Sequence, residues 1–470
     1  MKKKVEKISK TEEKQLIEKT KKISMKEAST YSVMDGFGLR YITPYALAVG
    51  ASNFYIGLLN SLPSLIGNLS QLFTLRAMKK WSRRKISFLG NFFQAIMWLM
   101  LIVAGSIYFN LNIKNQTSSL LVVIIYTLLI LFGAFGSPAW SSWMGDIIKK
   151  DERGIFFGRR SRIAGAVAII SLLIAGFILD YFKRTNIFIG FIILFSIAFI
   201  GRMISAYLIL QQYEPKFKQE DEYYFSFKEF IKKSIKNNFG KFTIYFGLVY
   251  LGVTIASPFF AVYMLRDLHF SYINYMIILL SGSLTSLLFM PAWGKFADKY
   301  GNKKVLQLTG FFLPIVPLFW FATIFIQPSL LVGYLFLIEA VTGVVWAGFN
   351  LAAGNFIYDA VSRQRIAICV SYFNIIAGIG VLLGSSLGGL ISSLKFNFFG
   401  LSPILFVILL SAIVRFLVYI LMGSKFQEVR EVQPLGIKQA GEKIRHLSLS
   451  KFQEYFDIHP AGILKSKPAI

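Results

Sequence analysis

The chain has 470 residues, of which 55% are hydrophobic and only 16% are charged. Soluble globular domains carry about 25% charged residues, so this composition excludes an ordinary water-soluble fold and favours a protein dissolved in the lipid bilayer. The formal net charge of +27 does not indicate a nucleic-acid binder, because phosphate recognition needs basic residues gathered on one soluble face. Here they stand in short runs between long apolar stretches, which is typical of the cytoplasmic loops of membrane proteins.

The first 26 residues form a Lys/Glu-rich run and not the apolar core of a secretory signal. We therefore expect residues 1–30 to be a cytoplasmic N-terminal tail. Its scattered apolar residues would allow contact with anionic lipid, although a solvated charged helix is the simpler interpretation.

Twelve apolar segments follow, each near the roughly 20 residues that a helix needs to cross the hydrocarbon core. This pattern predicts an all-α membrane protein with twelve transmembrane helices. The segments are residues 31–51, 54–75, 86–109, 119–146, 155–181, 187–211, 241–265, 272–293, 304–326, 329–358, 366–393 and 401–423.

The basic residues predict the orientation of these segments. With the N-terminus inside, the connections on the inner side are rich in Lys and Arg, which is the positive-inside pattern. We therefore expect a linker over residues 212–240 and a tail over residues 424–470, both cytoplasmic, in a multi-pass protein of the cell membrane. The outer connections hold only Lys114, Lys183, Arg184, Arg266 and Lys395.

Landmarks recur along the chain at an offset near 213 residues. Four matches in the same order indicate a duplicated six-helix unit. Because each unit has an even number of spans, the bundles 31–211 and 241–423 are expected to share one orientation as pseudo-symmetric halves. The matches are Thr43-Pro44-Tyr45 with Ser257-Pro258-Phe259, Asp146 with Asp359, Arg202 with Arg415, and Arg84-Lys85 with Lys303-Lys304.

The segment Gly294-Lys295-Phe296-Ala297-Asp298-Lys299-Tyr300-Gly301-Asn302-Lys303-Lys304 connects the apolar segments 272–293 and 304–326. It resembles the signature loop of the major facilitator superfamily, G-x-x-x-D-R/K-x-G-R-R/K, at the place where that family repeats it. The six-plus-six pattern and the long linker extend the resemblance over nearly the whole chain. The resemblance implies secondary transport by alternating access, with the substrate bound near the midplane between the halves.

Within this signature, Asp298 stands just past the expected helix end, where it can pair with a basic group or cap a neighbouring helix N-terminus. Gly294 and Gly301 permit close approach and a tight turn. A latch on the cytoplasmic gate is the functional interpretation, and a simple charged turn is the alternative. The basic candidates of this latch are Lys299, Lys303 and Lys304.

The first half departs from the signature, since a leucine and a lysine stand at its Gly and Asp positions. We expect two ion pairs to tie the inner helix ends together and to strengthen the closed cytoplasmic side. They are Asp146 with Arg153 and Asp359 with Arg365.

Ionisable residues inside a span are functional candidates, because they are costly to bury in lipid. In segment 31–51, Asp35 and Arg40 are separated by roughly 140° on a straight helix, so they are not expected to share a face. Arg40 is the candidate for an anionic substrate or a carboxylate partner, and Asp35 for gating or proton coupling. A structural ion pair is the alternative for each.

In segment 329–358, Glu339, Gly343, Trp346 and Asn350 recur at helical spacing on one face. The family resemblance implies that this segment lines the transport cavity, so Glu339, Trp346 and Asn350 are substrate candidates. Glu339 is the first candidate for a protonatable coupling group, and a protonated glutamate bonded between helices is the alternative.

The repeat places a matching stripe with Ser137 and Trp140 in segment 119–146, and these two residues are further substrate candidates. Arg202 and Arg415 also lie deep in their segments. Because they match by repeat, we expect an architectural role for both, with substrate contact as the alternative.

The residue types give no support for a cofactor or a metal site, since the one cysteine, Cys369, lies in an apolar segment. No P-loop and no H-E-x-x-H pattern occurs, so neither an ATP-driven pump nor an enzyme is expected. The predicted function is secondary transport of a small-molecule substrate by a monomer in membrane lipid, with protons as the candidate coupling ion. A non-transporting membrane sensor or scaffold that keeps the transporter fold is the alternative.

Overall fold

The computed structural model describes residues 9–111, 116–149, 152–215, 226–362, 365–394 and 401–433. Over these ranges the regular elements are all helices, which confirms the expected all-α fold. Those of the first half are α1 (Lys10–Phe37), η1 (Leu39–Tyr41), α2 (Ile42–Ala48), α3 (Asn53–Ala77), α4 (Arg83–Phe109), α5 (Gln116–Ile147), α6 (Arg153–Phe182) and α7 (Ile187–Leu210).

A short helix, α8 (Phe227–Ser234), precedes the second half. Ten helices of the described part are long and apolar enough to cross a membrane, and α1, α2 and α3 are not among them. The helices of the second half are α9 (Asn238–Val262), η2 (Tyr263–Asp267), α10 (Tyr272–Tyr300), α11 (Asn302–Phe312), η3 (Val316–Ile324), α12 (Pro328–Ala360), α13 (Ile366–Ser393) and α14 (Pro403–Met422).

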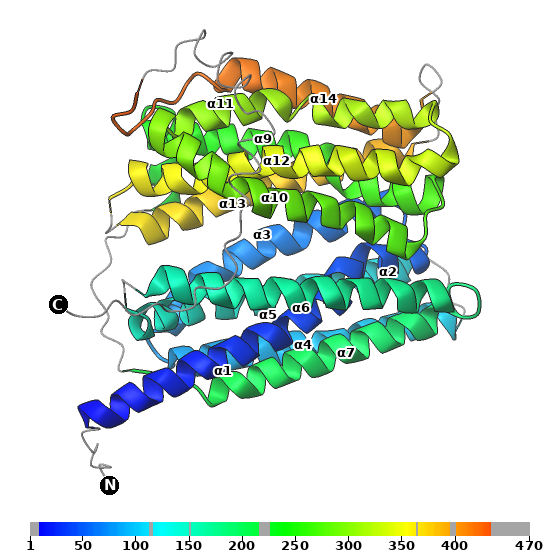
Figure 1. The fold of residues 1–470 in the computed structure, drawn as a ribbon. Coiled ribbons are helices and arrows are strands. Elements are labelled where there is room, and N and C mark those ends of the chain that lie inside the picture. Colours follow the sequence, from blue (N-terminus) through cyan, green and yellow to red (C-terminus); the bar gives the residue numbers. More distant parts are fainter. Residues whose placement is uncertain are drawn as a thin grey trace, which may run out of the picture.

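The helices form two bundles, one holding α1 to α7 and the other α9 to α14 (Figure 1). Within the second bundle α9 is the most enclosed helix, since 67% of its most apolar stretch is buried inside the protein, against 22% for α10. The bundles meet where α3 lies along α13 and where α6 meets α10. We call the end of the molecule where α1 begins and α14 ends the inner end, and the opposite end the outer end (Figure 1).

The contact between α3 and α13 starts at the outer end. Asn53 donates a hydrogen bond from Nδ2 to the carbonyl of Ser392 (2.9 Å), and the Phe54 amide donates to Ser393 Oγ (3.1 Å). Deeper in the bundle, Asn68 reaches the backbone carbonyl of α13 at residue 374 over 3.1 Å. These bonds join the halves along one pair of helices.

A second outer contact joins α6 to the start of α10. The carboxylate of Asp180 accepts the backbone amides of Tyr272 (2.7 Å) and Ile273 (2.9 Å), which are unpaired donors at a helix N-terminus. Arg266 adds a bond to Asn53 Oδ1 (3.0 Å). Apart from the one at Asn68, the hydrogen bonds between the halves described here all lie at the outer end.

The expected tail of residues 1–30 overlaps α1, which is continuous from Lys10 to Phe37. A capping box of Ser9 and Glu12 starts the helix. Thr20, Ser24 and Ala28 recur at four-residue spacing and are buried, because these small residues let α1 pack against α6 and α7. Residues 10–30 are therefore the first part of the first helix.

The first span is broken. α1 ends at Gly38, and η1 and α2 continue the path to the outer end. A Cβ at Gly38 would overlap with the ring of Trp98 from α4, so the glycine admits this ring against the backbone. The matching span of the second half, α9, stays helical through Pro258.

The signature segment is helical and not a loop. α10 runs to Tyr300, and Gly301 alone makes the turn with a φ of +90°, a conformation that favours glycine. The prediction that Asp298 stands past a helix end is wrong, because apolar residues at helical spacing extend α10 by about two turns. Those residues are Trp293, Phe296, Ala297 and Tyr300.

Residues 424–433 after α14 pack against the inner end of the second half, and we call them the C-terminal strap. Phe426 is fully buried among the rings of Phe242, Tyr245 and Phe356. Asn238 exchanges two hydrogen bonds with the backbone of the strap at residue 427 (2.9 and 2.7 Å). The expected tail of residues 424–470 therefore begins as ordered structure, and residues 434–470 lie outside the described part.

Candidate functional site

Asp35 and Arg40 lie together, with Arg40 Nε 3.5 Å from Asp35 Oδ2. The prediction that they do not share a face is wrong, because it assumed a straight helix and the break at Gly38 turns the chain between them. Half of the Arg40 side chain is exposed (51%), against 20% for Asp35. The pair is therefore formed, but its guanidinium remains accessible.

Residues from both halves surround this pair. Tyr275 of α10 is within Coulombic range of Arg40 and of Glu339 on α12. Tyr126 of α5 is within the same range of Asp35 and Arg40. We call these five residues the central cluster: Asp35, Arg40 and Tyr126 come from the first half, and Tyr275 and Glu339 come from the second.

Glu339 also lines a cavity of about 350 Å³ inside the second half, the C-half cavity, whose walls include Tyr275, Trp320 and Trp346. Its carboxylate makes no hydrogen bond or ion pair with a residue that the structure describes. Arg415 lines the same cavity and donates to the backbone carbonyls of Leu313 (2.9 Å) and Val253 (3.3 Å). This environment is mostly apolar and aromatic, with one free acid in it.

The predicted stripe on α12 is divided between different surroundings. Gly343 is buried against the backbone of Gly282 on α10, and Trp346 lines the C-half cavity. Asn350 is exposed and lines neither of the two cavities described here. The shared face predicted from spacing therefore does not become one shared binding surface.

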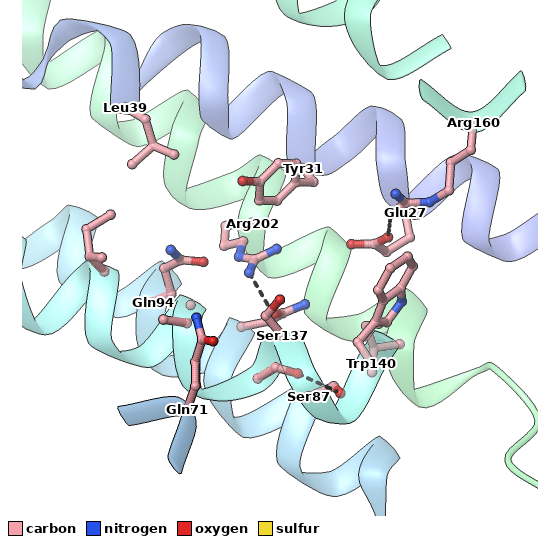
Figure 2. Close-up of a pocket in the computed structure, with 16 residues that line it drawn as sticks. Glu27, Tyr31, Leu39, Gln71, Ser87, Gln94, Ser137, Trp140, Arg160 and Arg202 are labelled. Atoms are coloured by element: carbon pink, nitrogen blue, oxygen red, sulfur yellow. Dashed lines mark hydrogen bonds and ion pairs between the residues drawn. The ribbon is translucent and has the colours of Figure 1, made fainter. Parts of the chain in front are cut away.

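A second cavity, of about 370 Å³, lies inside the first half, and we call it the N-half cavity. Figure 2 shows Glu27 pointing toward Arg160, with Tyr31 beside Arg202. Glu27 accepts from Arg160 Nη2 (2.7 Å) and from Ser205 Oγ (2.9 Å). Glu27 and Arg202 are each only 4% exposed, so these charges are enclosed by protein.

Arg202 is held by neutral groups. It donates from Nη2 to Asn91 Oδ1 (2.6 Å) and from Nη1 to Ser205 Oγ (3.1 Å), and its guanidinium lies 5.0 Å from the Tyr31 ring centre. Arg160 lies 4.4 Å from the ring centre of Trp140. Each arginine is thus oriented by an aromatic face, a favourable arrangement for a desolvated cation.

The predicted residues Ser137 and Trp140 both line the N-half cavity, as does Arg202. The sequence did not single out Glu27, Asn91 or Arg160 as site residues. One signal for Glu27 was available, because it precedes Tyr31 and Asp35 at four-residue spacing on the same helical face. Asn91 carried no such signal.

The inner end of the first half is organised around Arg83, whose side chain is buried (1% exposed). Arg83 Nη1 lies 2.5 Å from Asp146 Oδ2. Glu214 accepts the backbone amides of Arg83 (2.8 Å) and Arg84 (3.3 Å) at the start of α4. Asp146 is therefore tied to Arg83. The side chain of Arg153, its expected partner, lies outside the described part of the chain.

The inner end of the second half uses the strap. Arg430 Nε lies 2.7 Å from Asp359 Oδ2, and its Nη1 lies 3.4 Å from Asp298 Oδ1. Asp298 thus pairs with a basic group, whereas Glu428 accepts the amide of Lys303 at the start of α11 (2.7 Å). The pair of Asp359 with Arg365 stays a prediction.

Three further residues of the signature segment lie around this network. Gly294 is half-buried in α10, and a Cβ at this position would lie 3.8 Å from Leu351 Cδ2. Lys299 and Lys304 are exposed. No group of three or more His, Cys, Asp or Glu residues in the described ranges is arranged to hold a metal ion.

The sequence model of the Major Facilitator Superfamily matches residues 28–249 and, a second time, residues 242–456. The chain belongs to this superfamily. The double match covers most of the chain and divides it near the boundary between the two bundles. The superfamily is one of membrane transporters, so the expectation of a multi-pass transmembrane transport protein is confirmed.

Known proteins with related sequence or structure are transporters. A multidrug resistance efflux pump homologue of Lactococcus lactis subsp. lactis (strain IL1403) is 23% identical over 381 residues, which is 77% of this chain and 86% of the relative. A mutant of the nucleoside transporter NupG superposes with a TM-score of 0.64 at 17% identity, over 87% of this chain and 100% of that one. A bacterial homologue of the iron transporter ferroportin in an inward-facing state gives 0.64 at 14% identity, over 87% and 99%.

Proposed function

We propose that this protein is a secondary active transporter that moves a small solute by alternating access. The central cluster carries the proposal, because Asp35 and Arg40 come from one half and Tyr275 and Glu339 from the other. The halves are bonded mainly at the outer end. Rocking of the bundles around the cluster would then expose it to either side of the membrane in turn.

We propose twelve membrane crossings with both described chain ends at the cytoplasmic side. Ten helices qualify by length and hydropathy. The broken path of α1, η1 and α2 supplies one more crossing and α3 another. Neither is among the ten, since α1 is rich in Lys and Glu and α3 is rich in polar residues. The basic inner connections support this orientation, in the cytoplasmic membrane of the cell, for a monomer surrounded by lipid.

Proton coupling through Glu339 and Asp35 is part of the proposal. Glu339 has no partner among the described residues, and Asp35 has one at 3.5 Å, so both can change protonation without breaking a tight network. The named transporters act on unlike solutes, namely drugs, nucleosides and iron. Their names therefore support a small solute without choosing one.

The test uses purified protein in proteoliposomes. A screen of small solutes by thermal stabilisation first selects a ligand, because binding to the folded state raises its melting temperature. Solute-dependent proton movement is then followed with a pH-sensitive dye. The double variant Glu339→Gln with Asp35→Asn is expected to abolish proton movement, whereas Glu18→Gln on the exposed face of α1 leaves it unchanged.

Proton movement that survives the double substitution would contradict coupling through these carboxyls. A ligand that stabilises the protein but never crosses the bilayer would contradict transport itself and favour a sensor or scaffold.

A further inference from the structure

We infer that the transported solute carries a compact anionic group, such as a carboxylate, and that the N-half cavity binds this group through Arg160 and Arg202. The inference rests on the proposed transport function and names the chemical class of the solute. It begins from the charges inside the cavity.

The N-half cavity holds more positive than negative charge. Arg160 and Arg202 both line it, and Glu27 is the one acidic residue among its lining side chains. Glu27 is paired with Arg160, whereas the hydrogen-bond partners of Arg202 are the neutral side chains of Asn91 and Ser205. Ser205 in turn donates to Glu27, so one carboxylate serves two arginines, and the cavity favours a ligand that supplies the second negative charge.

Several residues that line the cavity also carry buried donors without a partner among the described residues. The Nε atoms of Arg160 and Arg202 and the Nε1 atom of Trp140 are buried and have no hydrogen-bond partner in the described structure. Gln94, which is 4% exposed, adds one unpaired acceptor at Oε1. Three N–H groups against one acceptor fit an acceptor-rich anion, and hydrogen bonds from guanidinium to carboxylate are among the strongest that proteins make.

Size and access suit a small solute. About 370 Å³ is near the lower limit of ligand pockets, which is roughly 300 Å³. Two lining residues, Tyr31 on α1 and Ser137 on α5, are exposed, so the cavity opens between these helices. Tyr31 stands one helical turn before Asp35 on α1. The opening is therefore next to the central cluster.

The C-half cavity does not offer the same chemistry. Its one arginine, Arg415, is equally enclosed (6% exposed) but donates to two backbone carbonyls, and one acid, Glu339, lines the cavity with it, so the lining holds one charge of each sign. Arg415 therefore provides a matched control for Arg202, since both stand at equivalent places of the repeat.

The experiment measures binding of benzoate to the purified full-length protein in detergent, at fixed pH and ionic strength, by calorimetry. Benzamide has the same ring without the charge and is expected to bind at least about tenfold more weakly. Glu27→Gln keeps an acceptor for Arg160 and Ser205 but removes the negative charge, so benzoate binding is expected to tighten about tenfold. A purely structural role of Glu27 would not produce tighter binding.

Arg202→Gln is expected to weaken benzoate binding by at least about tenfold, whereas Arg415→Gln leaves it unchanged. Since Arg202→Gln may simply fail to fold, the gain of affinity in Glu27→Gln is the deciding result. Equal binding of benzoate and benzamide, or no tightening in Glu27→Gln, overturns the inference. Binding of inorganic phosphate without benzoate also overturns it, because the anion would then not belong to an organic solute.

Failure of this inference and failure of the transport proposal give different results. Benzoate that binds in detergent but shows no counterflow in proteoliposomes contradicts transport and leaves the anion site intact. Counterflow of a neutral solute by a protein that does not bind benzoate contradicts the anion site alone.

Discussion

The inner ends of the two halves make the same backbone contact with a glutamate side chain. Glu214 accepts the amide at the start of α4, and Glu428 accepts the amide at the start of α11. These two glutamates stand one repeat apart and place negative charge where a helix N-terminus favours it. The capping framework is therefore common to both halves.

The halves differ in where the cation comes from. Buried Arg83 bonds Asp146 in the first half, whereas neutral Asn302 bonds Asp359 in the second (2.8 Å). Asp359 then takes its cation from Arg430 of the C-terminal strap, whose side chain is 36% exposed. In the first half the cation therefore belongs to a helix of the bundle, whereas in the second half it belongs to the strap that follows α14.

The largest effect is expected for Arg83→Met. This change leaves Asp146 and Glu214 without their cation. Arg83 is buried but the Asp146 side chain is 49% exposed, so the loss is expected to be below the roughly 3–5 kcal/mol of a fully buried pair. The melting temperature of the purified protein is expected to fall by several degrees. Asn302→Ala at the equivalent place of the second half loses the bond to Asp359 and a longer one from Asn355 (3.4 Å), together about 1–2 kcal/mol. Equal losses for both variants would remove the distinction between the two inner ends.

An intermediate effect is expected where α12 approaches α10. A Cβ at Gly343 would overlap with the carbonyl oxygen of Gly282, so Gly343→Ala is expected to destabilise by about 1–3 kcal/mol. Gly354→Ala on the same helix has open space and serves as the control. Thermal unfolding of both variants checks this, and a stable Gly343→Ala protein would show that the two helices can separate.

The smallest effect on stability is expected for Arg430→Ala. Its ion pairs are partly exposed, and such pairs contribute below about 1 kcal/mol. The strap should nevertheless detach more often, so trypsin should cleave at Lys425 faster than in the unmodified protein, with Arg430→Lys close to normal. An unchanged cleavage rate would show that burial of Phe426, and not the ion pairs of Arg430, retains the strap.

Composition, hydropathy and internal repetition were enough to predict the membrane class, the all-helical fold and the duplication of the chain. The sequence also indicated that Asp146 and Asp359 play matching roles, because both the hydropathy pattern and the repeat are local properties of the chain. Hydropathy misplaced two helix boundaries, the start of α1 and the end of α10, because both lie in charged stretches of the chain. It ended the tail at residue 30 and ended α10 before the signature segment, since a helix can continue where the chain stops being apolar.

Which charged side chains form ion pairs depends on the packing of the helices against one another. Arg83 and Asp146 are 63 residues apart, and Glu27 and Arg160 are 133 apart, so their pairing depends on which helices are neighbours and how each is rotated. The meeting of Asp35 and Arg40 depends on a helix break next to the ring of Trp98 on another helix. Periodicity within one segment carries no information on such contacts, because they are set by packing between segments.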